Sequence, residues 1–371
     1  MPADPGRWLR VLLAVPLLAL GCAAARPVHP SLADRLGDLL LVGFRGTEVG
    51  DNGELLHLLC DLKVGGVILF ERNITSPEQV ARLTHDLQAL ARHCAGRPLL
   101  IAVDGEGGVV MRLSPKAGYT PTLGHGDLGE LDDLALTELE ARRIGAMLRE
   151  AGINWNLAPV VDVALNPWNS VVTQAGRAFA ADPERVTAHA RAFLRGMRAA
   201  GILSSLKHFP GHGSSFQDSH LGFTDVTLTA NPEIELRPYR ELIAERLADS
   251  VMTAHVFNRR VDPDYPATLS RATVGGLLRG ALGFDGVVVS DDLLMGAISE
   301  HYGLERAAVL GVAAGVDVLL ISDNAPPRAE AAAARARSAI VNALAGGTLE
   351  PSTVESALAR IDRLRARLGG S

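Results

Sequence analysis

Short apolar runs alternate with longer segments of helical periodicity along most of the chain, and this alternation restricts the fold more than any other feature of the sequence. Most of the runs are apolar throughout, which is typical of strands buried on both faces in a parallel sheet covered by helices. The pattern predicts seven strands, over VGGVILF (Val64–Phe70), LLIAVD (Leu99–Asp104), NWNLAPVVDV (Asn154–Val163), ILSSLKHF (Ile202–Phe209), SVMTAHV (Ser250–Val256), GVVVSDD (Gly286–Asp292) and VDVLLIS (Val316–Ser322). A weaker eighth candidate, LLLVGF (Leu39–Phe44), fits a helix equally well.

The segments between these strands carry apolar residues three and four positions apart, which is the spacing of an amphipathic helix. They include Leu131–Ala151, Pro183–Ala200 and Leu304–Ala314, and an alanine-rich tail adds Pro326–Leu344 and a last helix after it. Repetition of strand and helix favours a closed barrel over a doubly wound sheet. The expected fold class is therefore α/β, a single TIM-like (β/α)8 barrel in which one strand can be irregular or missing, and 371 residues suffice for it.

The N-terminus has the features of an export signal. Two arginines precede an apolar run, Val11–Leu20, that is too short for a membrane span of roughly 20 apolar residues. Cys22 follows Gly21 as in the lipobox of bacterial lipoproteins, although two preceding positions depart from the usual residues. We expect lipidation of Cys22 and an exported protein anchored on the periplasmic or cell-surface side of a membrane. An ordinary signal peptide and an uncleaved anchor are the alternatives.

The expected division of the chain is a signal peptide with lipobox over residues 1–22, a linker over 23–30, and a single catalytic barrel over 31–371. A formal net charge of −6 argues against a nucleic-acid partner. Beyond Cys22 the chain has Cys60 and Cys94, neither of which lies in a CxxC pattern. An oxidising compartment would allow one bridge between them, but we expect two thiols that are buried or neutral.

Several predicted strands end in polar residues that a buried strand does not otherwise need. The carboxyl ends of the strands in a (β/α) barrel form the floor of the active site, so these side chains are expected to converge on one pocket. Each alone is more simply a helix cap or a loop contact, but five strands share the feature. The residues are Asp104, Glu106, Asp162, Lys207, His208, His255, Asp291 and Asp292.

The segment SLKHFPGHGSSFQDSH (Ser205–His220) concentrates histidines beside a lysine and an aspartate. A metal site would draw on its three histidines and Asp218, but HxxxH spacing requires a helix, which Pro210 and two glycines disfavour. A phosphate cradle is disfavoured because the bulky His212 separates the glycines, and the sequence has no GxSxG motif of a serine hydrolase. We therefore expect neither a metal nor a cofactor.

The remaining possibility is a site that cleaves a glycosidic bond with two groups, one acting as nucleophile and the other as proton donor. Asp291, at the end of GVVVSD, is a carboxylate on a rigid strand terminus. Asp218 and His220, which are separated by one residue on a loop, are expected to form a proton-transfer dyad in which the carboxylate orients the imidazole. Imidazoles titrate near neutrality, so one can donate a proton in one step and accept one in the next. These roles predict retention of configuration.

The segment KHFPGHGSSFQDSH (Lys207–His220) resembles the KHFPGHG, four residues, DSH motif of bacterial β-N-acetylglucosaminidases of glycoside hydrolase family 3. A motif of this length rarely arises by chance. The resemblance continues in order through GGVILF (Gly65–Phe70), IAVDGEGG (Ile101–Gly108), GINWNLAPVVDV (Gly152–Val163), GRAFAADP (Gly176–Pro183), MTAHV (Met252–Val256), GFDGVVVSDDLLMGA (Gly283–Ala297) and AGVDVLL (Ala314–Leu320).

The resemblance implies a TIM-like barrel that, without a metal, removes terminal non-reducing β-linked N-acetylglucosamine with retention, from peptidoglycan fragments or chitooligosaccharides. It implies that Asp291 forms the glycosyl-enzyme and that His220, partnered by Asp218, is the acid and base. Asp292 is the rival nucleophile, but successive side chains of an extended segment point oppositely, so only one is expected to face the pocket. The implied sugar-binding residues are Asp104, Arg112, Arg177, Lys207 and His208.

The chain departs from this family where DQEGGR is usual. It has DGEGGV, with Gly105 and Val109 in place of the glutamine and the arginine, and Ala180 replaces a usual glycine. These changes spare the three implied catalytic residues but put substrate affinity and the leaving-group side of the site in doubt. His212 and His255 are expected to shape loops or hold neighbours by hydrogen bonds rather than to contact the substrate.

Other functions stay open at this level. Another β-glycosidase or a phosphorolytic β-N-acetylglucosaminidase is the nearest, because a neutral histidine repels an incoming phosphate less than a glutamate does. A metal-dependent hydrolase is a second class, and a non-catalytic sugar-binding lipoprotein, suggested only by DGEGGV, is a third. We expect a monomer whose partners are a carbohydrate substrate and, through the lipid anchor, a membrane.

Overall fold

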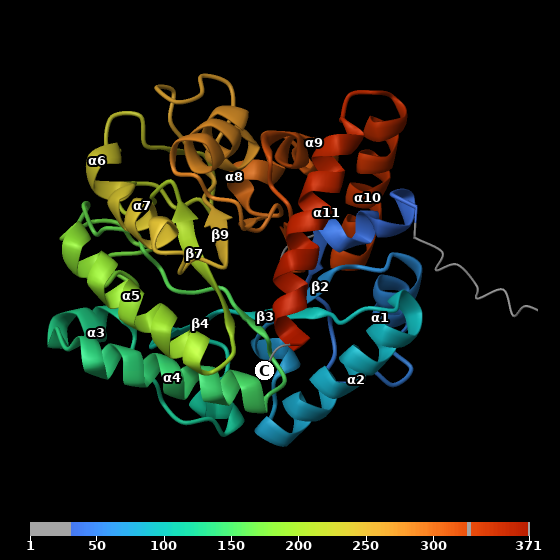
Figure 1. The fold of residues 1–371 in the computed structure, drawn as a ribbon, viewed down its shortest axis with the longest axis horizontal. Coiled ribbons are helices and arrows are strands. Elements are labelled where there is room, and N and C mark those ends of the chain that lie inside the picture. The colour runs from blue at the N-terminus through green and yellow to red at the C-terminus, as the bar shows by residue number, and fades with distance from the viewer. Residues whose placement is uncertain (1–30, 325–327, 370–371) are drawn as a thin grey trace, which may run out of the picture.

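Eight parallel strands follow one another in chain order around a barrel (Figure 1). The computed structural model describes residues 31–324 and 328–369, so the expected leader and linker, with Cys22, lie outside the described residues. The predicted TIM-like α/β fold is confirmed. The strands are β1 (Leu40–Val42), β2 (Gly66–Leu69), β3 (Leu100–Val103), β6 (Trp155–Asn156), β7 (Leu203–Phe209), β9 (Ser250–Thr253), β11 (Val287–Ser290) and β12 (Leu319–Ile321).

The barrel closes at an incomplete seam between β11 and β12. A single bridge, between Val289 and Val318, joins this pair, and the amide of Ser290 donates to the carbonyl of Val318 at 2.9 Å. The weak eighth candidate is a strand, because β1 pairs in parallel with both β2 and β12. The predicted run Asn154–Val163 is too long, since β6 has two residues and Pro159 has no amide hydrogen with which to extend its ladder.

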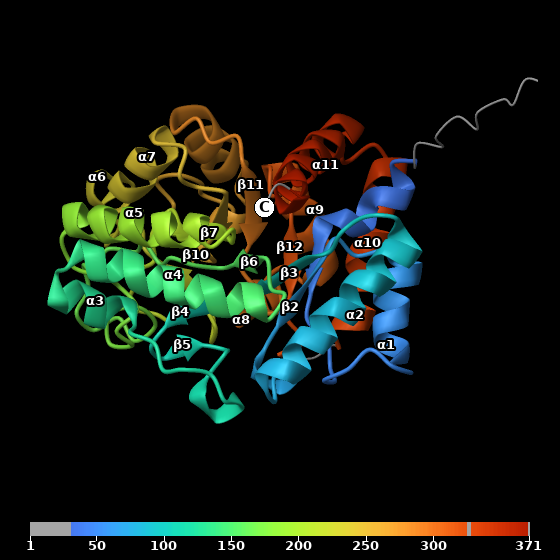
Figure 2. The same cartoon turned by 60° about the horizontal axis from the view of Figure 1, so that its bottom comes forward.

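Helices surround the strands (Figures 1 and 2). The predicted helix Leu304–Ala314 has the predicted bounds, but Leu131–Ala151 is divided: Asp132 adopts the left-handed conformation, and the Asp133 carboxylate accepts the amides that start the next helix. In the described residues no helix is both long and apolar enough to cross a membrane. The helices are α1 (Gly53–Leu56), α2 (Pro77–Ala95), α3 (His125–Leu131), α4 (Leu134–Glu150), α5 (Pro183–Ala199), α6 (Pro232–Glu235), α7 (Arg237–Ala244), α8 (Gly296–Ser299), α9 (Leu304–Ala314), α10 (Ala329–Ala345) and α11 (Pro351–Ala366).

Two short strand pairs lie outside the barrel, above the carboxyl ends of its strands. The antiparallel hairpin of β4 (Gly105–Gly107) and β5 (Val110–Met111) directly follows β3. The parallel pair of β8 (Thr224–Asp225) and β10 (Val256–Phe257) joins the segments that follow β7 and β9. Both pairs stiffen the loops from which the polar strand-end residues project.

The opposite end of the barrel is held by α11, drawn in red beside β11 in Figure 2. Buried aspartates stand just before three strands, namely Asp38 before β1, Asp249 before β9 and Asp317 before β12. Each pairs with an arginine of α11 or the turn after it: Arg365 with Asp38 at 2.8 Å, Arg367 with Asp249 at 2.5 Å and Arg360 with Asp317 at 2.9 Å. Burial makes such charges depend on their partners, so α11 completes this end of the barrel.

The expectation of two neutral thiols is wrong, because Cys60 and Cys94 form a disulfide with their Cα atoms 4.8 Å apart. Cys60 lies on the π-helix His57–Asp61 that continues α1, and Cys94 lies in the last turn of α2. The two helical segments pack together, which brings together cysteines 34 residues apart in the sequence. No local cysteine pattern marks such a pair.

Candidate active site

A cavity of about 380 Å³ opens at the carboxyl ends of the strands. Asp218 does not line this cavity, but the Asp218 carboxylate binds the ring of His220, which does. Of the eight strand-end residues expected to converge, Asp104, Lys207, His208, Asp291 and Asp292 line this cavity, whereas Glu106, Asp162 and His255 do not. Loops that follow β3, β6 and β7 add further residues to the wall. Seven of the predicted site residues line the cavity: Asp104, Arg112, Arg177, Lys207, His208, His220 and Asp291.

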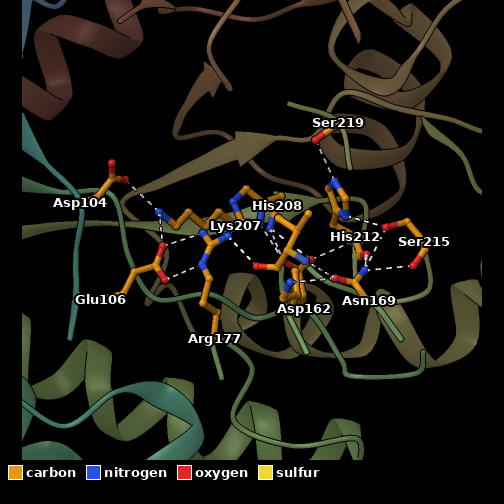
Figure 3. A network of polar contacts seen from close by, with 12 residues as sticks. Asp104, Glu106, Asp162, Asn169, Arg177, Lys207, His208, His212, Ser215 and Ser219 are labelled. Carbon is orange, nitrogen blue, oxygen red and sulfur yellow. Dashed lines mark hydrogen bonds and ion pairs between the residues drawn. The ribbon is translucent and has the colours of Figure 1, made fainter. Parts of the chain in front are cut away.

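Glu106, one of the strand-end residues expected at the pocket but without a stated role, is the centre of a buried ionic network (Figure 3). Its two oxygens accept hydrogen bonds from Arg177 at 2.8 and 2.9 Å, and Lys207 lies 2.7 Å away. Lys207 also donates to Asp104 at 3.0 Å. Burial alone would lower the pKa of Lys207, but Asp104 and Glu106 raise it, so the ammonium stays charged. Arg177 and Lys207 are thus fixed cationic donors at the cavity.

The β4–β5 hairpin turns the chain so that Arg112 returns to Asp104. The guanidinium donates to the carboxylate at 3.3 Å and lies 5.7 Å from the ring centroid of Phe70. Burial alone would raise the pKa of Asp104, but Lys207 and Arg112 lower it. Asp104 therefore remains an ionised acceptor that can bind sugar hydroxyls.

The two departures from DQEGGR have different surroundings. Gly105 is clamped by the amide side chain of Asn156, which accepts from its N–H and donates to its carbonyl, both at 2.9 Å. A Cβ at this position would lie 3.0 Å from the Asn156 Oδ1, so Asn156 would have to shift for a side chain to fit. Val109, at the hairpin tip, is 74% exposed and is not part of the cavity wall.

Asp162 fixes the histidines that follow β7 (Figure 3). Its carboxylate lies 2.7 Å from Nδ1 of His208 and accepts the backbone amide of His212 at 2.8 Å. Burial alone would raise the pKa of Asp162, but His208 lowers it. The ladder between β7 and β9 shifts register between Leu206 and Phe209, so His208 and its neighbour Lys207 both reach the cavity. Asp162, like Glu106, is a strand-end residue expected at the pocket that instead supports residues of the cavity wall without lining it.

Asp291 directly follows β11 and is partly buried. Burial alone would raise the pKa of its carboxyl, but neighbouring histidines and the amide of Asp292 lower it to about 2. These histidines are His255, His208 and His220. The carboxylate is therefore ionised and can serve as a nucleophile at any pH above about 3.

Asp292 also contributes to the cavity wall, so the expectation that only one of the two aspartates faces the cavity is wrong. Strand β11 ends at Ser290, and the turn that follows does not keep the alternation of an extended strand. The surroundings nevertheless differ, because the Asp292 carboxylate accepts the amides of Leu294 and Ser322, both at 3.1 Å, and the Ser322 hydroxyl. Asp292 holds the turn after β11 and the end of β12 together.

The Asp292 carboxyl gives the fold a pH dependence. Burial raises its pKa to about 6 from 3.8, so the folded state binds a proton more tightly than the unfolded state. The free energy of unfolding should therefore rise as pH falls from 6 to 4, by up to about 3 kcal/mol from this group. Asp292→Asn should remove this contribution, so that urea unfolding at pH 4 to 7.5 shows a stability difference between variant and parent that changes with pH. A constant difference would contradict the assignment.

Asp218 and His220 form a dyad within one loop. The carboxylate accepts the backbone amide of His220 at 2.9 Å and contacts its Nδ1 at 2.7 Å. The imidazole is 56% exposed and forms part of the cavity wall, so its Nε2 is the nitrogen available for a substrate. Among residues 31–324 and 328–369, no group of three or more His, Cys, Asp or Glu side chains is placed to hold a metal ion.

His255 supports the backbone next to Asp291 by hydrogen bonds. Its Nε2 lies 2.9 Å from the carbonyl of Asp292 and its Nδ1 lies 2.8 Å from the Thr268 hydroxyl, while burial lowers its pKa. Its ring does not belong to the cavity wall, in agreement with the expected supporting role.

The strand-end Asp291, the Asp218–His220 dyad and the cations Arg177 and Lys207 gather at one cavity at the carboxyl ends of the strands, an arrangement that fits a barrel glycoside hydrolase. The model of the glycosyl hydrolase family 3 N-terminal domain matches residues 31–364. The chain belongs to glycoside hydrolase family 3, and its substrates are carbohydrates.

Individual relatives agree with this assignment. A curated β-hexosaminidase of Alkalilimnicola ehrlichii is 40% identical over 293 residues, which cover 77% of this chain and 80% of the relative. A family 3 β-N-acetylglucosaminidase of Paenibacillus sp. str. FPU-7 has a similar structure, with a TM-score of 0.86 and 39% identity over 92% of this chain and 63% of that one. A β-N-acetylhexosaminidase of Beutenbergia cavernae has a TM-score of 0.82 and 32% identity over 91% of this chain and 99% of that one. The chain thus spans less than two thirds of the Paenibacillus protein.

Proposed function

We propose that this protein is a retaining exo-β-N-acetylglucosaminidase that removes terminal non-reducing residues from peptidoglycan fragments or chitooligosaccharides. The observation that carries the proposal is that the Asp291 carboxylate and the His220 imidazole line the same cavity, with Asp218 holding the imidazole from behind. The relatives named above, two of them β-N-acetylhexosaminidases or β-hexosaminidases and one a β-N-acetylglucosaminidase, support the choice of sugar.

Two steps complete the reaction. In the first, a carboxylate oxygen of Asp291 bonds to the anomeric carbon while His220, protonated at Nε2, gives that proton to the departing glycosidic oxygen. In the second, the now neutral His220 takes a proton from water as the water oxygen attacks the same carbon and releases Asp291. Asp218 stabilises the charged imidazole and fixes its orientation. Two displacements at one carbon retain the configuration.

The rest of the cavity suits one sugar ring. Its volume of about 380 Å³ is at the lower end of small-molecule pockets, which fits removal of one terminal residue at a time. Ionised Asp104 with Arg112, and the cations Arg177 and Lys207, offer acceptors and donors to sugar hydroxyls. Their mutual ion pairs fix their positions before a ligand arrives, which reduces the entropy lost on binding.

Hydrolysis of p-nitrophenyl β-N-acetylglucosaminide and of the corresponding β-glucoside, each with and without phosphate and with EDTA, tests the proposal. We expect faster hydrolysis of the N-acetylglucosaminide, no phosphate requirement and no loss with EDTA. Proton NMR of the first product should show the β anomer before mutarotation. Sugar 1-phosphate as the main product would indicate a phosphorolytic enzyme, a zinc-restorable loss with EDTA would indicate a metal-dependent one, and α-anomeric product would exclude the mechanism.

We propose in addition that the protein is exported and lipidated at Cys22. The disulfide between Cys60 and Cys94 supports export, because such bonds persist in oxidising compartments. Expression in a bacterial host should place the protein in the membrane fraction, and Cys22→Ala should release it to the soluble fraction. Wild-type protein that stays in the cytosol with two titratable thiols would contradict export.

A further inference from the structure

The dyad lies on a loop, residues 214–222, that connects β7 to β8 and is here called the acid–base loop. The imidazole of His220 is more than half exposed, so the ring itself makes few contacts that could hold the loop in place. The residue before it, Ser219, is buried. The position of the dyad over the cavity therefore depends on what binds the loop around Ser219.

The first such contact comes from His212. Its Nε2 lies 2.9 Å from the hydroxyl of Ser219, and its Nδ1 lies 2.8 Å from the hydroxyl of Ser215 (Figure 3). Burial lowers the pKa of His212 to about 4, so the ring is neutral at pH 7 and one nitrogen donates while the other accepts. Because both nitrogens face hydroxyls, either tautomer satisfies both bonds.

His212 is itself immobile. Its amide donates to Asp162 at 2.8 Å, and its carbonyl accepts the side-chain amide of Asn169 at 2.8 Å. The same Asn169 amide donates to the hydroxyl of Ser215 at 2.9 Å, so one of the two partners of the ring is also fixed from the neighbouring loop. The His212 imidazole is therefore held in a fixed position, and its Nε2 forms the hydrogen bond to Ser219 in the acid–base loop.

The second contact comes from the segment that follows Asp291. The amide of Gly296 at the start of α8 donates to the carbonyl of His220 at 3.3 Å, and that of Ala297 to the carbonyl of Ser219 at 3.4 Å. A Cβ on Gly296 would lie 3.2 Å from the His220 oxygen and 3.1 Å from the Leu221 carbonyl carbon. The absence of a side chain therefore lets the loop backbone rest on the turn that carries the nucleophile.

We propose that His212 and Gly296 are positioning residues that hold the acid–base loop, and with it His220, over the cavity. His212 acts through its hydrogen bond to the Ser219 hydroxyl. Gly296 acts because it lacks a side chain, which lets its backbone approach that of His220 and Leu221. The proposal rests on the proposed function, in which His220 protonates the leaving oxygen. His212 and Ser219 also line the cavity, but the role requires only the bond between them and no contact with the substrate.

The role predicts a kinetic signature that general structural damage would not produce. Proton donation matters for a sugar leaving group, whose alcohol is a weak acid, and hardly matters for 2,4-dinitrophenolate, which departs without a proton. Loosening of the loop should therefore slow cleavage of N,N′-diacetylchitobiose and spare cleavage of the dinitrophenyl glycoside. Damage to the cavity or to Asp291 would slow both substrates alike.

Two variants address the two contacts, and one serves as a control. Ser219→Ala removes the hydroxyl that binds His212, and Gly296→Ala introduces the methyl group that crowds the His220 carbonyl. We expect each to lower kcat/KM for the disaccharide about tenfold, as loss of one hydrogen bond or a small displacement allows, and to change the first-step rate on the dinitrophenyl glycoside less than twofold. Ser76→Ala, which removes a hydroxyl that caps α2, is the matched control and should change neither.

Hydrogen exchange of the intact protein gives a readout that needs no activity. Peptides covering residues 217–222 should exchange faster in Ser219→Ala and in Gly296→Ala than in the parent, and those covering Asp162 and His212 should not change. Equal losses on both substrates, or unchanged exchange in residues 217–222, would overturn the proposal. Faster exchange in a protein that cleaves none of these glycosides would sustain the two contacts while the proposed function fails.

Discussion

Replacement of Asp291 by asparagine should reduce kcat on β-N-acetylglucosaminides by at least ~1000-fold, which is in the range measured when an enzyme loses its nucleophile. The carboxylate has a pKa of about 2 and stands beside three histidines, so the parent enzyme carries a negative charge there at every working pH. Asparagine has a similar shape but neither the charge nor the nucleophilicity. The substrate should still bind, with KM changed far less than kcat.

Asp292→Asn is the matched control, because the same change is made one residue along the chain. Its carboxylate is engaged by Leu294 and Ser322, so we expect a loss of no more than about tenfold, from a disturbed turn. A mechanism-based 2-deoxy-2-fluoro sugar should label the peptide containing Ser290–Leu293 in the parent. Fragmentation that places the label on Asp292, or a variant pair with the opposite ranking, would show that the nucleophile is wrongly assigned.

Replacement of His220 by alanine should lower kcat for N,N′-diacetylchitobiose at least ~100-fold, as removal of an acid–base group commonly does. An activated aryl glycoside should still form the glycosyl-enzyme, which would then accumulate because the base for the second step is missing. Azide, which needs no base, should restore turnover and give the β-glycosyl azide. Asp218→Asn should give a smaller loss with the same dependence on the leaving group, since the imidazole remains but loses its charged partner.

The assignment of His220 makes two further demands. The azide product should have the β configuration, because a second displacement on a covalent intermediate restores the original side of the ring. Equal losses on activated and unactivated substrates, with no azide rescue, would assign His220 to substrate binding and leave the acid unidentified. The parent protein, treated identically, should be insensitive to azide.

Much of the fold follows from the sequence because apolar runs and helical periodicity are local signals. The seven strand predictions and the helix Leu304–Ala314 needed no knowledge of neighbours. The errors lie where the outcome depends on partners. Leu39–Phe44 could not be distinguished from a helix until β2 and β12 lay on either side of it, and the length of β6 depended on what its neighbours could pair with.

The sequence predicted most of the residues that line the cavity, but not the roles of the buried carboxylates that hold those residues in place. Several residues that line the cavity, among them Asp104, Lys207 and Asp291, stand at strand ends, a position readable from the order of apolar and polar residues. Glu106 and Asp162 stand there too, but their roles come from Arg177 and His208, which are 71 and 46 residues away. Which carboxylate faces a ligand and which is buried beneath a cation is a property of packing, not of spacing. The disulfide escaped prediction for the same reason.

The base of the barrel has a consequence for the order in which the protein acquires its structure. A ribosome produces Asp38, Asp249 and Asp317 before Arg360, Arg365 and Arg367, which complete their ion pairs. Asp38 and Asp317 can already pair with Arg97 and Arg279, which are synthesised earlier. Asp249 has only the more distant Arg198, at 3.8 Å, until Arg367 emerges. Because a buried charge depends on its partner, the strand end at Asp249 is the part of the barrel base that depends most on the last residues to be synthesised.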